Sequence, residues 1–200
     1  MKLILEAIEK TRSEGFPALV LLAEQDKLLG GLPKDRSDLQ NRIAAVVKNQ
    51  ANKVLGDSME LIPDGDFLAA VFQVPQKKGL SREDRLRLAA SRIGEWQKGR
   101  SLPRIAISAG QLSSSEIRAL CEGFLIAAYD FRKYKSEKKA ETSEPEVVIL
   151  ASGEGFKKGA TAVAEAEALC RQINFCRDLV NEPGSALDPQ DFTEAARKVA

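Results

Sequence analysis

The sequence predicts an α/β protein in which a mixed sheet is flanked by helices in three layers. Two observations carry this prediction. Short apolar runs of strand length alternate along the chain with longer segments whose apolar residues recur at helical spacing. One run, Val147–Leu150, is continuous and rich in β-branched residues, which is typical of a strand that is buried on both faces.

The first half of the chain is expected to hold three strands and a helix. Phe16–Ala23 is predicted as the first strand, and Gly30, Gly31 and Pro33 mark the turn that leaves it. The next segment is predicted as a helix over 37–47, with one apolar face made by Leu39, Ile43, Val46 and Val47. Two further strands, joined as a hairpin through the turn at 63–66, are predicted at Val54–Ile62 and Phe67–Val74.

The second half is expected to alternate helices with two short strands. Ser81 caps a helix whose apolar face is made by Leu86, Ala89, Ala90, Ile93 and Trp96. A strand at Arg104–Ser108 follows. Ser113 and Glu116 then form a capping box, and the helix that it opens is expected to turn inward Ile117, Leu120, Cys121, Phe124, Leu125 and Ala128. A surface loop over 135–144, the strand Val147–Leu150 and a long helix over Phe156–Val180 complete the order.

Composition excludes several classes of protein. The 200 residues carry 30 basic and 29 acidic side chains, so no overall field attracts nucleic acid or an anionic membrane. The apolar run near the N-terminus is too short for the core of a signal peptide, and the longest apolar runs cannot span a bilayer. The odd number of cysteines (Cys121, Cys170 and Cys176), all on helical patterns, indicates reduced thiols that serve as small core residues in a cytosolic protein.

A glycine-rich turn at Gly153, Gly155 and Gly159 follows a strand and opens a helix. This context is found in loops that hold phosphate groups. However, the spacing is one residue longer than the dinucleotide fingerprint, and no second strand presents an acidic residue to a ribose. We interpret the glycines as a turn and a helix start, with a phosphate site as the alternative.

The sequence contains two basic clusters, and the first could be a nucleic-acid binding site. Arg132, Lys133 and Lys135, with Lys138 and Lys139 beyond and with Tyr129 and Phe131 upstream, could form a basic stripe with stacking rings. Glu137 and Glu141 interrupt that stripe, so we expect Phe131 and Tyr134 to close a helix end against the core. The second cluster is interleaved with acids and is interpreted as a solvated helix face made by Arg82, Arg85, Arg87 and Arg92.

The sequence contains no histidine, which excludes Ser-His-Asp and Cys-His centres and zinc bound by histidine. Carboxylate-only metal sites remain open in principle, because hard cations prefer oxygen ligands. The candidate pairs, Asp64 with Asp66 and Asp188 with Asp191, lie in a turn and at a helix cap, where acids serve structure.

The chain ends inside a predicted helix. Asp188 is expected to cap a helix that begins at Pro189, with Asp191 completing a capping pair. The apolar stripe of this helix is made by Phe192, Ala195, Ala196 and Val199. Because no terminating Gly or Asn follows, and no segment that could cover the stripe, we expect the 200 residues to be part of a longer protein.

Two sequence blocks resemble one known family. The first is Arg177–Asn181, with Pro183 and then Asp188-Pro189; the second is Glu122–Phe124, followed by Tyr129-Asp130-Phe131 and Tyr134-Lys135. These two blocks, in the order in which they follow each other along the chain, resemble segments of the two-metal leucyl aminopeptidases of the cytosolic type. Residues 1–110 resemble the family only in the order of their elements. Cys176, where a small Ala is usual, and Gly184-Ser185, where an Asn-containing turn is typical, depart from its pattern.

The resemblance implies a division of the chain into three parts. Residues 1–155 would form an N-terminal α/β domain with a macro-domain-like fold. Residues 156–183 would form a linker helix and turn, in which Arg177 and Asp178 anchor the junction and Pro183 with Gly184 redirects the chain. Residues 184–200 would be the first helix of a C-terminal peptidase domain.

The resemblance also implies a function for the complete protein. Family members release N-terminal amino acids, with leucine preferred, by means of two divalent ions, manganese or zinc. The residues that do this chemistry lie in the C-terminal domain, and none of those positions exists here, so we assign no catalytic, cofactor-binding or metal-binding residue to this chain. The chain alone is expected to be inactive and to serve assembly or regulation. Its implied partners are its own catalytic domain and the other subunits of a cytoplasmic homo-hexamer.

Two other hypotheses come from different classes of protein. A standalone macro-domain-like module would bind ADP-ribose or another nucleotide at strand ends, and it predicts glycine-rich phosphate loops after two strands. Only the loop at Gly153 approaches that pattern. A DNA-binding accessory protein would need a basic face, which the near-neutral charge balance does not supply.

Overall fold

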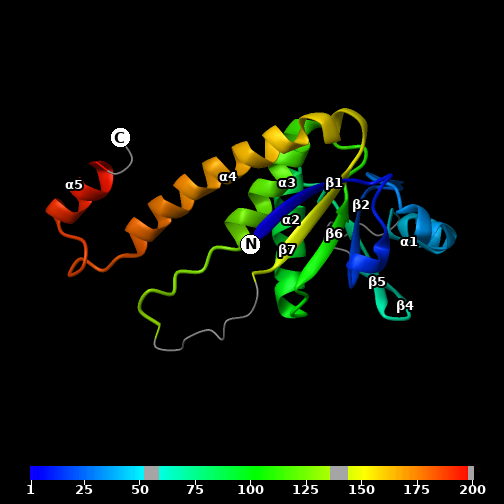
Figure 1. Cartoon of the computed structure of the whole chain (residues 1–200), viewed down its shortest axis with the longest axis horizontal. Helices are drawn as coiled ribbons and strands as arrows, with labels where there is room; N and C mark the ends of the chain where they lie inside the picture. Colours follow the sequence, from blue (N-terminus) through cyan, green and yellow to red (C-terminus); the bar gives the residue numbers. More distant parts are fainter. Residues whose placement is uncertain (52–58, 136–143, 198–200) are drawn as a thin grey trace.

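A single mixed sheet forms the centre of the molecule. The computed structural model describes residues 1–51, 59–135 and 144–197 (Figure 1). The strands are β1 (Lys2–Ala7), β2 (Ala18–Glu24), β3 (Lys27–Leu28), β4 (Met59–Asp64), β5 (Phe67–Gln73), β6 (Arg104–Ser108) and β7 (Glu146–Ala151). They lie in the order β1-β7-β6-β2-β5-β4, with β3 beside β2. The β4–β5 and β2–β3 pairs are antiparallel and the other pairs are parallel, which confirms the mixed sheet.

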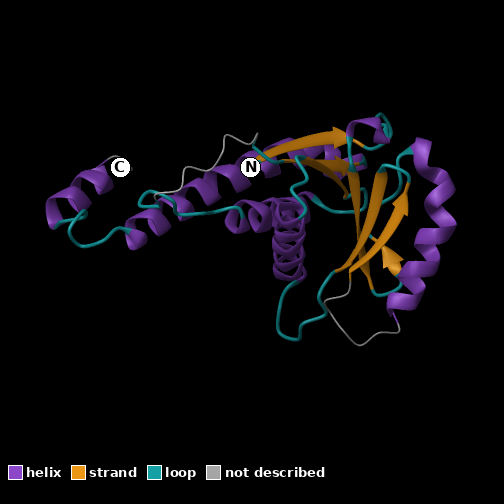
Figure 2. Ribbon diagram, turned by 90° about the horizontal axis from the view of Figure 1, so that it is seen from below, coloured by secondary structure: helices purple, strands orange, loops and turns teal. Residues whose placement is uncertain are grey.

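Helices cover both faces of this sheet and make three layers, as predicted. Helix α1 (Gln40–Ala51) lies on one side (Figure 2). Helices α2 (Arg82–Gly99), α3 (Ser114–Ala127) and the first half of α4 (Gly153–Asn181) lie on the other side. Short 3₁₀ turns occur at Ser13–Gly15 and Lys34–Leu39. The last helix, α5 (Pro189–Arg197), lies away from the sheet beyond the end of α4.

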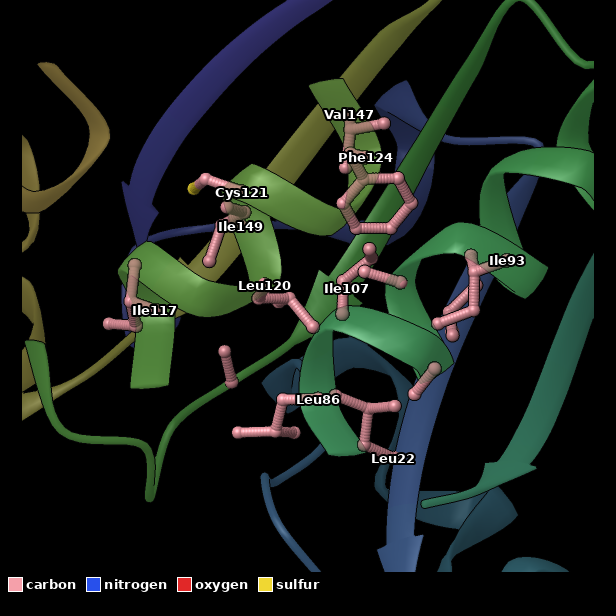
Figure 3. Packing of buried hydrophobic residues seen from close by; sticks show 14 of the residues in the cluster. Leu22, Leu86, Ile93, Ile107, Ile117, Leu120, Cys121, Phe124, Val147 and Ile149 are labelled. Carbon is pink, nitrogen blue, oxygen red and sulfur yellow. The ribbon is translucent and has the colours of Figure 1, made fainter. Parts of the chain in front are cut away.

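The core consists of two clusters, one on each face of the sheet. Strand β2 contributes to both, because successive side chains of a strand point to opposite faces. Ala18, Val20 and Leu22 belong to the cluster under α2 and α3, and Leu19, Leu21 and Ala23 belong to the cluster under α1. Figure 3 shows the first cluster, in which Phe124 and Leu120 of α3 meet Ile107 of β6 and Ile93 of α2.

Most predicted elements are present, with ends shifted by a few residues. The hairpin is confirmed, with Gly65 at a φ of +61° in its turn. The Ser81 cap is present, and the capping box of Ser113 and Glu116 forms both of its hydrogen bonds. Leu39, Ile43 and Val47 are buried as expected.

Two expectations about elements are wrong. Phe16–Ala23 is not the first strand, because Lys2–Ala7 precedes it and pairs in parallel with β7, from Lys2 opposite Glu146 to Ala7 opposite Ala151. Ala128 does not point inward: it is the exposed C-cap of α3, one residue beyond the face that packs on the core.

Some predictions fall outside the described residues. These are the first part of the strand predicted to begin at Val54, most of the loop predicted over 135–144, and the place of Val199 in the last helix. Among the helices that the structure describes, none combines the length and the hydrophobicity that a membrane span requires.

Candidate functional site

The C-terminal half of α4 extends beyond the sheet. A helix of 29 residues is about 43 Å long, whereas a six-residue strand spans about 20 Å. The first half of the helix is packed, with Ala162, Ala166 and Cys170 buried in the core. After Cys170, no described residue of α4 is buried, and the helix projects away from the sheet (Figure 1). Polar, charged and thiol side chains are clustered at this projecting end.

A segment that follows α3 contacts the projecting end through Tyr129. Its hydroxyl donates a hydrogen bond to the Asp178 carboxylate at 2.7 Å and accepts one from the Asn181 amide at 3.1 Å. The guanidinium of Arg177 lies 4.0 Å from the centre of the Tyr129 ring and donates a hydrogen bond to the Ile126 carbonyl at 3.0 Å. Desolvation, with the hydrogen bond to Asp178 next, raises the pKa of Tyr129.

The same segment holds Glu182, the C-cap residue that follows the helix. Lys133 Nζ lies 2.7 Å from one Glu182 carboxylate oxygen, and the Tyr134 hydroxyl donates to the other at 2.5 Å. The hydrogen bond from Lys133 lowers the pKa of Glu182, and the hydrogen bond to Glu182 raises the pKa of Tyr134. The two sequence blocks that carry the family resemblance therefore meet in space.

The role expected for Tyr134 is wrong. It does not close a helix against the core, because its side chain is more than half exposed (54%). Its ring centre lies 5.9 Å from that of Phe131, with the two rings tilted, and its hydroxyl binds Glu182. The basic side chains of this segment are paired with acids: Lys133 with Glu182, and Arg132 and Lys135 with Asp130. Lys138 and Lys139 lie outside the described residues.

A shallow groove lies along the same end of α4 and includes Arg177 and Asn181, which also contact Tyr129. Its volume is about 630 Å³, and it is lined by Gln172, Ile173, Cys176, Arg177, Val180 and Asn181. Val180 is 83% exposed, a high value for a branched aliphatic side chain on a helix. Cys176 is also exposed, which corrects the expectation that all three cysteines are core residues; Cys121 and Cys170 are buried as predicted. Burial raises the pKa of the Cys121 thiol to about 12.

The glycine-rich turn serves close packing. Gly153 begins α4 with a φ of +54°, a conformation that favours glycine. A Cβ at Gly155 would clash with the Leu112 carbonyl, and one at Gly159 would lie 2.8 Å from a methyl group of Leu5. These contacts agree with the interpretation as a turn and a helix start.

Three of the four candidate carboxylates, those of Asp64, Asp188 and Asp191, are engaged by arginines or by backbone N–H groups. Asp64 accepts from Arg36 at 3.0 Å and lies 3.5 Å from Arg42. Asp188 accepts from the backbone N–H groups of Gln190 and Asp191, and the Asp191 carboxylate accepts from the backbone of Asp188, so the predicted capping pair is confirmed. Within residues 1–51, 59–135 and 144–197, no group of three or more His, Cys, Asp or Glu residues could hold a metal ion.

Arg82, Arg85 and Arg87 of the second basic cluster form an ion-pair network, and the side chains of Arg82 and Arg87 remain 42% and 37% exposed on the helix face. Arg85 bonds Glu24 at the end of β2, and Arg82 bridges Glu24 and Glu116. Arg87 and Arg118 both reach Glu122, whose side chain is only 4% exposed. These pairs join α2, α3 and the sheet. Asp84 pairs with Arg87 along α2 itself, but Glu24, Glu116 and Glu122 come from other elements, which helical periodicity along one segment could not show.

Part of the site was missed from the sequence. Ile173 and Val180, which line the groove, were not singled out, although Leu169, Ile173, Cys176 and Val180 follow one another at helical spacing. That stripe was a usable signal, because it continues past the point where the helix leaves the core. The pairing of Glu182 with Lys133 and Tyr134 left no such signal, because nothing local links residues 48 or 49 positions apart.

The comparisons with known proteins agree on one group. The chain is 27% identical over 194 residues to a probable cytosol aminopeptidase of Aquifex aeolicus, covering 94% of this chain and 38% of the relative. It is 28% identical over 198 residues to a probable cytosol aminopeptidase of Rhizobium johnstonii, covering 92% of this chain and 38% of the relative. The chain resembles the N-terminal part of cytosol aminopeptidases. The resemblance inferred from the two sequence blocks is confirmed.

Two solved structures share the fold. A mutant of tomato leucine aminopeptidase aligns with all of this chain and 42% of its own length, with a TM-score of 0.72 at 17% identity. The bottromycin maturation enzyme BotP aligns with 92% of this chain and 37% of its own, with a TM-score of 0.61 at 16% identity. No family model matches the sequence. The chain thus spans about two fifths of the length of the cytosol aminopeptidases that it resembles.

Proposed function

We propose that this chain is the non-catalytic N-terminal domain of a leucyl aminopeptidase and that it serves assembly or regulation of the complete enzyme. The complete enzyme would release N-terminal amino acids, leucine preferred, from peptides. Support comes from similarity that extends over more than nine tenths of this chain but covers only 38% of the relatives. The free thiols agree with a cytoplasmic location.

The observation that carries the proposal is the projecting end of α4. Its groove is lined by the exposed Val180 and Cys176 and by Ile173, which is partly buried. An exposed apolar strip of this kind on an otherwise well-packed domain is typical of an interaction surface. We propose that the catalytic domain of the same protein docks there, that residues 184–200 open that domain, and that the complete protein assembles as a homo-hexamer.

The proposed chemistry lies outside this chain. Two divalent ions, manganese or zinc, would polarise the peptide carbonyl and activate water in the catalytic domain. The candidate acids Asp64, Asp188 and Asp191 do not fit such ions, because arginines and backbone N–H groups already engage their carboxylates. We assign no step of the reaction to residues 1–200.

A nucleotide-binding module is the second candidate, and the geometry favours it less. Ligands of parallel sheets bind at the carboxyl ends of the strands. Here the loops at those ends pack on one another: Ser108 donates a hydrogen bond to the Gly31 carbonyl, and Ser152 donates one to the Gly110 carbonyl at 2.6 Å. A Cβ at Gly30 would clash with Ser108, so the backbones are already in close contact.

The test uses the polypeptide that the complete reading frame encodes, with Val180→Asp as the probe and Leu88→Asp as a matched control on an exposed position of α2. Its molar mass in solution and its manganese-dependent hydrolysis of leucine p-nitroanilide are measured. Val180→Asp should lower activity or assembly by about tenfold or more, since an unpaired charge is costly in a closed interface, and Leu88→Asp should not. Absence of hydrolysis in the complete wild-type polypeptide, or equal behaviour of the two variants, would contradict the proposal.

A further inference from the structure

The contacts between the segment Tyr129–Lys135 and the end of α4 form one connected unit, which we call the clasp. It comprises Tyr129, Lys133 and Tyr134 on one side and Arg177, Asp178, Asn181 and Glu182 on the other. The hydrogen-bonded partners are separated by 48 to 52 residues in the sequence. In Figure 1 the segment leaves the end of α3 and runs below the projecting part of α4.

The projecting helix end needs such support. Helices stabilised only by their own hydrogen bonds are marginal in water, and most helical stability in proteins comes from packing of an apolar face. Beyond Cys170 the described part of α4 buries no residue. The clasp supplies tertiary contacts there, and nearly all of them are polar: two tyrosine hydroxyls, an ammonium and a guanidinium are matched to two carboxylates, an amide and a carbonyl.

The clasp acts at the residue where the helix ends. Glu182 is the C-cap of α4 and has an extended backbone (φ −69°, ψ 134°). Pro183 follows, and a proline disfavours the helical conformation in the residue before it. The local sequence therefore explains why the helix ends before Pro183. The contacts of Glu182 with Lys133 and Tyr134 hold this end of the helix in place.

We propose that the clasp is a positioning device: the segment Tyr129–Lys135 fixes the C-terminal end of α4 and thereby the direction in which the chain continues towards α5. The inference does not depend on the proposed function, because every contact that it invokes lies within residues 126–182. The proposal explains why Tyr129 and Tyr134 follow α3, because these two side chains belong neither to the hydrophobic core nor to the lining of the groove.

The test is hydrogen exchange measured by mass spectrometry on the chain itself. The double variant Tyr129→Phe/Tyr134→Phe keeps both rings and removes the hydroxyls that bind Asp178, Asn181 and Glu182. Amides of residues 172–181 should exchange at least about tenfold faster, because the free energy of local opening sets the rate, while those of α3 should not change. Lys158→Met is the control, because it removes an exposed ion pair with Glu154 on the same helix but outside the clasp.

Unchanged exchange over 172–181 in the double variant, with α3 protected as in the wild type, would overturn the proposal. A second measurement on the wild type covers the case in which the variant does not fold. The sequence contains only two tyrosines and both lie in the clasp, so absorbance at alkaline pH reads the clasp alone. Both should ionise above the ordinary pKa of 10.0 in the native chain and return to it in urea. Ionisation of both tyrosines at the ordinary pKa of 10.0 in the native chain would also overturn the proposal.

Discussion

At the scale of single residues, a glycine decides how closely two neighbouring helices approach each other. Gly123 of α3 faces α2, where a Cβ would clash with the Arg87 carbonyl and would lie 2.7 Å from the Ala90 Cβ. On the same helix Glu122 holds both Arg87 and Arg118. The adjacent residues Glu122 and Gly123 thus have two effects: Gly123 allows α2 and α3 to approach closely, and Glu122 forms the ion pair with Arg87 that joins them.

Replacing Gly123 by alanine should destabilise the chain. The added methyl group meets backbone that cannot move aside without separating α2 from α3, and overpacking of this kind costs about 1–3 kcal/mol. Urea unfolding should show that loss. Gly99→Ala is the matched control, since a Cβ there meets nothing within 4 Å, and its stability should stay unchanged or rise by up to about 1 kcal/mol. Equal stability of the two variants would refute the close-packing role of Gly123.

At the scale of elements, the clasp and α5 show two ways in which a helix lies outside the core. The end of α4 is held by polar contacts across 48 to 52 residues of sequence. In contrast, α5 has a cap formed by Asp188 and Asp191 but buries no residue, and its Phe192 is 55% exposed. Local signals placed both helices correctly, whereas their surroundings depended on tertiary contacts that periodicity does not show.

The clasp should have a pH window. The pKa of Glu182 is lowered by Lys133 and then Tyr134, so the stabilisation from its charge is complete above its ordinary value of 4.5 and is lost as the pH falls through the lowered native value. The pKa of Tyr134 is raised by Glu182, so its contribution is complete below 10.0 and is lost as the pH rises through the raised native value. Near-UV circular dichroism of the tyrosines should be constant between these limits. The acid transition should be absent in Glu182→Gln, and an identical transition in that variant would contradict the assignment.

Helix α5 should be among the least protected parts of the described chain. Isolated helices of about a dozen residues or fewer are marginal in water, and the nine residues of α5 have only a cap to support them. Amides of residues 193–197 should exchange far faster than those of residues 117–127 in α3, whose inner face is fully buried. Similar protection of the two segments in a demonstrated monomer would mean that α5 packs on its own domain.

At the scale of the whole molecule, the sequence was sufficient to predict the three layers but not the edge strand β1 of the sheet. Alternating strands and helices predicted the three layers, and buried runs such as Val147–Leu150 identified inner strands. Strand β1 was missed because Lys2–Ala7 is only partly buried, and its pairing with β7 spans more than 140 residues. The candidate site was predictable only in part: Arg177 and Asp178 were named as anchors from the resemblance, but their partner Tyr129 became apparent only in the fold.

The most direct test of a non-catalytic N-terminal domain is hydrolysis of leucine p-nitroanilide by residues 1–200 alone, compared with the polypeptide of the complete reading frame. Manganese, zinc or magnesium is supplied in each assay. The domain alone should show no turnover with any of the three metals, because its described residues contain no group of three or more His, Cys, Asp or Glu that could hold a metal ion, and the complete polypeptide should be active. Metal-dependent turnover that copurifies with residues 1–200, is lost on chelation and returns when the metal is restored would contradict the proposed function.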